Sequence, residues 1–70
     1  MDAEQMRRQI EDLAKVKNLA VEEIGSRLNL PTVHRDLLLE INGKGKVTGL
    51  SRERRIQIAG EIISRLRNFS

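Results

Sequence analysis

The chain has 70 residues and a net charge of +3, with 39% hydrophobic and 33% charged residues. A chain of this length buries only about 60% of the surface that its unfolded form exposes, so we expect one small domain over residues 1–70 with one modest core. The lack of cysteine excludes disulfides, thiolate nucleophiles and cysteine-bound metals. The opening MDAEQ does not resemble a signal peptide, and no apolar run approaches membrane-spanning length. We therefore expect a soluble, cytoplasmic protein without a membrane partner.

Charge is distributed unevenly along the chain. Residues 1–40 carry 6 Lys or Arg against 8 Asp or Glu, a net of −2, whereas residues 41–70 carry 7 against 2, a net of +5. This asymmetry suggests a face that meets a polyanion or an acidic partner. The alternative is an ordinary solvated helix surface.

Apolar residues at helical spacing predict a first helix over residues 2–17. Its inner face is formed by Met6, Ile10, Leu13 and Ala14. A second, shorter helix is expected from residue 20 to about residue 29, with Val21, Ile24 and Leu28 on one face. The pair Glu22 and Glu23 suits its first turn, where the helix dipole favours anions.

Pro31 is the only proline, and proline is tolerated in the first turn of a helix but disrupts the interior. We therefore end the second helix before Pro31 and begin a third there, which continues to Asn42-Gly43. The apolar residues of this third helix share one face: Val33, Leu37, Leu38 and Ile41.

Residues 42–50, NGKGKVTGL, are expected to form a loop in which residues 46–48 could be extended. Ser51 is a good N-cap and predicts a fourth helix that continues to about Asn68. Its inner face would hold Ile56, Ala59, Ile63 and Leu66. No segment alternates with period two over a useful length, so the expected fold is all-α: a compact orthogonal bundle of four helices, or alternatively five.

The segment LAKVKNLAVEEIGSRLNLPTV resembles the opening of helix-turn-helix domains of the lambda-repressor or Cro type. Gly25 stands where that family keeps a small residue, because the two helices of the motif approach closely there. Asn29 stands at the turn position usually held by glycine, and asparagine is the next-best residue for a left-handed conformation. The later segment EINGKGKVTGLSRERRIQIAGEI resembles the family's Glu-Asn-Gly-Lys loop and the helix after it. The sequence departs from the pattern at Arg35, where the family usually has a core Val or Ile, and in a longer third helix and loop.

The resemblance implies that the third helix lies in the major groove of DNA with its first residues on base edges. The residues at these positions are Thr32, His34, Arg35 and Asp36. His34 is then a surface or groove residue, and Arg35 could donate two hydrogen bonds to guanine.

The basic loop and the start of the fourth helix would hold the DNA backbone. Cations in the first turn of a helix cost about 0.3–1 kcal/mol each, a penalty that a bound phosphate would remove. We expect backbone contacts from Lys44, Lys46, Ser51, Arg52 and Arg55. The alternative is that the arginines pair with Glu40, Glu53 or acidic residues of the first helix.

These features predict a double-stranded DNA-binding protein, a regulator of transcription or of a mobile element. It would bind two half-sites as a homodimer through Ile58, Ile62 and Phe69, although this apolar row could equally complete the core of one chain. The alternative is a helical protein-interaction module whose basic face docks an acidic partner, which the leucine run 37–39 favours. We expect no enzyme, cofactor or metal site, because His34 has no second histidine beside it, no serine has a plausible base partner, and GKGKVTG lacks the Lys-Ser or Lys-Thr pair of nucleotide-binding loops.

Overall fold

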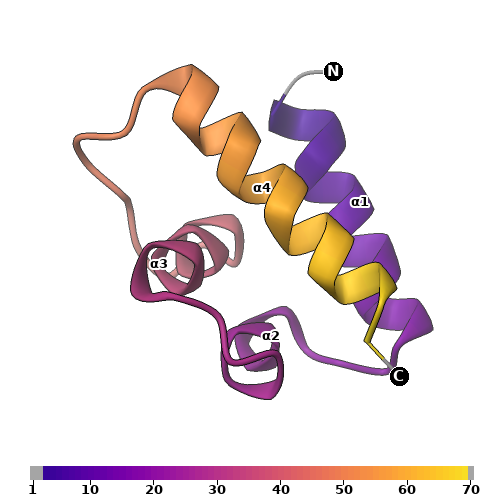
Figure 1. Ribbon diagram of the computed structural model, residues 1–70. Helices are drawn as coiled ribbons and strands as arrows, with labels where there is room; N and C mark the ends of the chain where they lie inside the picture. The colour runs from indigo at the N-terminus through magenta and orange to yellow at the C-terminus, as the bar shows by residue number, and fades with distance from the viewer. Residues whose placement is uncertain (1–2, 70) are drawn as a thin grey trace.

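The computed structural model describes residues 3–69, which form four helices and no strand: α1 (Ala3–Val16), α2 (Val21–Arg27), α3 (Thr32–Ile41) and α4 (Arg52–Arg67). The expected all-α class and the number of helices are confirmed. In Figure 1, α1 and α4 lie side by side, while α2 and α3 are seen nearly end-on and cross that pair at a steep angle. None of the four helices is long and apolar enough to cross a membrane.

The core lies between the α1–α4 pair and the two shorter helices. Its fully buried side chains come from three helices: Ile10, Ile24, Ile58, Ile62 and Leu66. Full burial of one such side chain stabilises the fold by about 1.5–3 kcal/mol, so these five positions account for much of the packing energy. The expected inner residues Met6, Ala14, Leu37 and Leu38 are also buried.

Three of the four helices end in the same backbone arrangement. Asn18, Asn29 and Gly43 follow α1, α2 and α3 with φ of 59°, 55° and 75°, which is the left-handed region. After each of them the chain donates an N–H back into the helix, from Leu19 to the carbonyl of Ala14 at 2.8 Å, from Leu30 to Gly25 at 2.9 Å and from Lys44 to Leu39 at 2.9 Å. This is the Schellman motif, and the expected left-handed Asn29 is confirmed.

The helix starts are also defined by local chemistry. Ser51 Oγ accepts the N–H of Arg54 at 3.1 Å, which confirms Ser51 as the N-cap of α4. Before α2, the carboxylate of Glu23 accepts the N–H of Ala20 at 3.1 Å. Pro31 is the extended residue before α3 and not its first helical residue, with φ −61° and ψ 161°. The segment 46–48, which could have been extended, is not part of a strand.

Candidate nucleic-acid interface

α2 and α3 are joined by the short connection 28–31 and approach each other closely at Gly25. A Cβ built on Gly25 would lie 2.7 Å from Cγ of Arg35, which is too close for two carbon atoms. The Nε–H of Arg35 donates to the carbonyl of Leu30 at 2.9 Å. The aliphatic part of the Arg35 side chain therefore packs against α2, as an apolar side chain would at this position. Arg35 as a whole is nevertheless an exposed residue.

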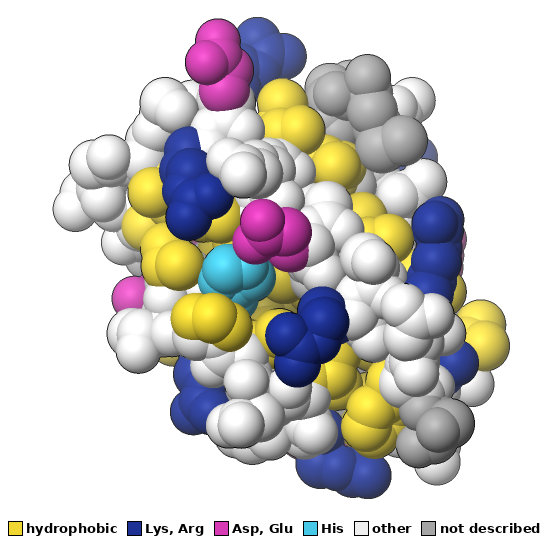
Figure 2. All heavy atoms as spheres, viewed as in Figure 1, with side chains coloured by type: hydrophobic (Ala, Val, Ile, Leu, Met, Phe, Trp, Pro, Cys, Tyr) yellow, Lys and Arg dark blue, Asp and Glu magenta, His cyan; other side chains and the backbone are white. Residues whose placement is uncertain are grey.

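His34 does not lie at the surface as expected, because it belongs to the inner face of α3 together with Leu37 and Leu38. Its exposed fraction is 8%, and its Nε2 lies 2.7 Å from Oε1 of Glu61 on α4. Figure 2 shows this histidine among hydrophobic side chains with an acidic side chain against it. His34 Nδ1 is buried and has no hydrogen-bond partner among the described residues. His34 thus connects α3 to α4 and is not a candidate for base contact.

The exposed side of α3 carries one stripe at positions i, i+3, i+4 and i+7, which we call the outer stripe: Thr32, Arg35, Asp36 and Leu39. The leucine run is therefore divided between two sides of the helix. Leu37 and Leu38 are buried in the core, whereas Leu39 is 41% exposed. Thr32, Arg35 and Asp36 lie on this stripe at positions where base contacts were expected, and Leu39 extends the stripe by one turn.

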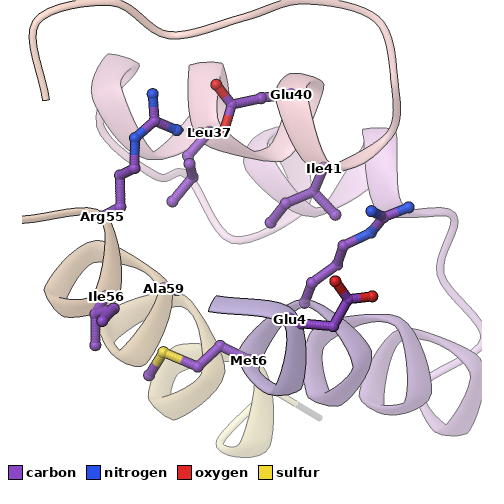
Figure 3. Close-up of a pocket in the computed structure, with 9 residues that line it drawn as sticks. Glu4, Met6, Leu37, Glu40, Ile41, Arg55, Ile56 and Ala59 are labelled. Carbon is purple, nitrogen blue, oxygen red and sulfur yellow. Dashed lines mark hydrogen bonds and ion pairs between the residues drawn. The ribbon is translucent and has the colours of Figure 1, made fainter. Parts of the chain in front are cut away.

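The basic loop, residues 42–51, is fixed at its centre by two charged side chains. Glu40 on α3 accepts the N–H of Val47 at 2.8 Å, and Arg55 on α4 bonds to both Glu40 and the carbonyl of Val47. Figure 3 shows Arg55 reaching from α4 toward Glu40 on α3, at the edge of a hollow of about 280 Å³ that is also lined by Met6, Leu37 and Ala59. We call these three groups the Glu40–Val47–Arg55 clamp.

The clamp sets the ionisation of Glu40. Burial by itself raises the pKa of this carboxyl, but the hydrogen bond from Val47, the hydrogen bond and charge of Arg55, and the charge of Lys46 together outweigh burial. The pKa of Glu40 therefore lies below its usual value. Arg55 was expected at a DNA phosphate, whereas the structure uses its guanidinium inside the clamp, which is one of the pairings considered from the sequence.

The other cations of this region differ in their availability. Lys44 Nζ lies 2.7 Å from Oε2 of Glu22 on α2, an exposed pair that contributes at most about 1 kcal/mol. The side chains of Lys46, Arg52 and Arg54 are in exposed residues and form no ion pair with the part of the chain that the structure describes. Because Arg55 bonds to Val47, the clamp holds Lys46 next to the start of α4. These three residues are the cations that the fold leaves open to an external anion, and we call them the open cations.

The face of the molecule shown in Figure 2 carries several basic side chains but no cluster of them. On the face shown in Figure 2 they stand apart from one another between apolar and uncharged groups. This view contains α2, α3 seen end-on, one side of α4 and, along its left edge, the loop between α3 and α4, and it shows no continuous basic patch among the described residues.

The apolar row considered for a homodimer belongs to the core. Ile58 and Ile62 are both 0% exposed within a single chain, so neither is available to a second copy. Phe69 is half-buried against the core, and the guanidinium carbon of Arg27 lies 5.6 Å from the centre of its ring. Ile58 and Ile62 are buried because they lie on the side of α4 that faces the core, between α1 and the two short helices.

Residues 3–69 contain no cluster of three or more histidine, aspartate, glutamate or cysteine side chains that could hold a metal. Comparison of the chain with protein-family models, with curated proteins and with solved structures finds no match. The candidate interface is therefore defined by its own geometry alone. Sequence reasoning did not include Arg54 and Leu39 among the site residues, although the helical spacing from Thr32 and Arg35 would have placed Leu39 on the same stripe.

Proposed function

We propose that the protein binds double-stranded DNA, with α3 in the major groove and the basic loop on the sugar-phosphate backbone, as a regulator of transcription or of a mobile element. The observation that carries this proposal is that the Glu40–Val47–Arg55 clamp holds the loop with Lys46 against the exposed stripe of α3, while the other two open cations, Arg52 and Arg54, are exposed in the first turn of α4. Backbone contacts position such a protein, and the exposed side of the inserted helix reads the bases.

The connection between α2 and α3 supports the same proposal. A short turn through a left-handed asparagine and a close approach at Gly25 are features that a helix-turn-helix motif requires. The base-facing residues would be those of the outer stripe, with Arg35 partly engaged by Leu30. His34 and Arg55 would act indirectly, by holding α3 and the basic loop in place.

The test is the salt dependence of binding to duplex DNA, measured by fluorescence anisotropy. Each phosphate contact contributes about −0.9 to the slope of log affinity against log salt. Removal of the three open cations by Lys46→Ala, Arg52→Ala and Arg54→Ala should therefore flatten the slope by about 2–3. The triple variant Arg8→Ala, Lys15→Ala and Arg67→Ala is the matched control, because it removes the same charge from exposed positions on α1 and at the far end of α4.

An acidic protein partner is the second candidate, and the exposure of Leu39 beside Lys46 favours it. Apolar side chains at the centre of a charged surface are common in protein interfaces. Absence of duplex binding at low salt, or equal slopes for the two triple variants, would contradict the DNA proposal and leave this candidate.

A further inference from the structure

We propose that Leu39 recognises the 5-methyl group of thymine in the major groove, an inference that rests on the proposed binding of duplex DNA. Among the described residues, only two large hydrophobic side chains are exposed, Val16 at 77% and Leu39 at 41%. Val16 is at the end of α1, whereas Leu39 lies on the outer stripe of α3. Leu39 is thus the one large apolar group on the surface that would face the bases.

Leu39 forms one wall of a shallow hollow of about 320 Å³ between α3 and the basic loop. The hollow is also lined by Asp36 on α3 and by Gly45, Lys46, Val47 and Thr48 of the loop. Cβ of Leu39 lies 3.8 Å from the position that a Cβ on Gly45 would take, so the base of the side chain is supported while its end remains open to solvent. A small apolar group could therefore contact the end of Leu39 without rearrangement of the loop.

The charges around the hollow determine what can lie there. Asp36 stands one helical turn before Leu39 on the same stripe, and its carboxylate would repel a phosphate. Lys46 stands on the loop side of the same hollow and attracts one. A duplex placed against this surface would be oriented with its backbone at the loop and its base edges along α3.

Thymine is the base whose major-groove edge fits a leucine. It presents a methyl group beside its O4 acceptor, whereas guanine, adenine and cytosine present hydrogen-bond donors or acceptors there and no methyl group. Burial of a polar base edge against leucine would leave that edge without a partner, which is unfavourable. Contact with a methyl group carries no such penalty and removes apolar surface from water.

The experiment begins with selection of tight binders from a random duplex library by the full chain, followed by replacement of each thymine in a selected duplex by uracil, one at a time. Uracil keeps the hydrogen-bonding groups of thymine and lacks the methyl group. We expect at least one replacement to weaken binding about three- to fivefold, which corresponds to the burial of one methyl group. The other replacements should change affinity by less than about 1.5-fold.

The Leu39→Ala variant should bind the thymine and uracil duplexes equally at the sensitive position and keep the salt slope of the wild type, because the open cations are unchanged. Val16→Ala is the control, since it shortens the other exposed apolar side chain, which is not on α3, and should keep the full discrimination.

Circular dichroism would verify that both variants stay folded. If duplexes bind with a steep salt slope but no thymine replacement matters, or if Leu39→Ala discriminates like the wild type, this inference is wrong and the proposed function stands. Absence of duplex binding at low salt would overturn both.

Discussion

Glu40 on α3 and Arg55 on α4 form an ion pair, and both side chains also bond to the backbone of Val47 in the loop that connects their helices. The two charged side chains are each about three-quarters buried, at 23% and 25% exposure. A loop with glycine at 43, 45 and 49 has a large conformational freedom in the unfolded chain. The clamp offsets this freedom by fixing the centre of the loop to both helices.

Replacement of Glu40 by glutamine should lower the free energy of unfolding by about 1–2 kcal/mol, because it removes the negative charge that pairs with the partly buried guanidinium of Arg55. Urea denaturation at pH 7 measures this change. Asp12→Asn is the control, since Asp12 is exposed and forms no ion pair with the described residues, and it should stay within about 0.5 kcal/mol of the wild type. Equal stability of Glu40→Gln and the wild type would show that the clamp does not stabilise the fold.

The contribution of Glu40 should also depend on pH. Because the pKa of Glu40 is lowered in the folded chain, its contribution is complete above the unfolded value of about 4.3 and is lost as the pH falls through the folded value. The difference in unfolding free energy between the wild type and Glu40→Gln should therefore shrink as the pH is lowered below the unfolded pKa of about 4.3. Denaturation curves at several pH values give this difference directly, and a gap that stays constant would contradict the lowered pKa.

Gly25 and Arg35 should be energetically coupled. Gly25→Ala places a Cβ against the stem of Arg35 and should destabilise the fold by about 1–3 kcal/mol, although alanine favours a helix over glycine by up to about 1 kcal/mol. In an Arg35→Ala background the Cγ contact is removed and Cβ of residue 35, at 3.4 Å, remains in ordinary van der Waals contact, so Gly25→Ala should be neutral or stabilising. A double-mutant cycle by thermal or urea unfolding measures the coupling, and additive effects would show that the close approach carries no strain.

The left-handed asparagine between α2 and α3 should tolerate glycine but not alanine. Asn29 has φ of 55°, in the left-handed region, where most residues with a Cβ are strained by about 1–2 kcal/mol. Asparagine tolerates this conformation better, because its short polar side chain can form local hydrogen bonds. Asn29→Ala should therefore be about 1 kcal/mol less stable than the wild type, while Asn29→Gly should be equal or more stable. Asn42 caps α3 with φ of −82°, so Asn42→Ala is the matched control and should change stability much less. Similar losses at both positions would argue against the Schellman motif as the source.

His34 should be replaceable by leucine but not by alanine. Alanine leaves a cavity between α3 and α4 and should cost about 2 kcal/mol, whereas leucine fills the space and removes the unpartnered Nδ1. Glu61 is 47% exposed and can be hydrated after the loss of the hydrogen bond. We expect His34→Leu to remain within about 1 kcal/mol of the wild type by urea denaturation. A large loss in this variant would indicate that the bond to Glu61 is a main link between the two helices.

Helical periodicity and turn chemistry were sufficient to predict the four helices and their ends. Pro31, Asn29, Gly43 and Ser51 each act locally, through a fixed φ, a left-handed conformation or a side-chain cap, so their effects can be read from neighbouring residues. The site was predicted less completely. Thr32 and Arg35 are exposed on α3 as expected, but His34 lies on the core side of the same helix. Neighbouring residues of a helix point in different directions, so His34 and Arg35 cannot both lie on the exposed side.

The sequence by itself determined where each helix lies, which of its faces is apolar and that the excess positive charge falls in the second half of the chain. Only the tertiary structure decided which charges remain available. Arg55 and Arg52 are three residues apart, yet one is held by Glu40 and Val47 and the other is open. The tertiary structure also decided that Ile58 and Ile62 belong to the core, because the packing of the helices buries both side chains within one chain. The physical reason is that pairing and burial depend on which elements meet in space, and contacts between distant segments are not contained in local spacing.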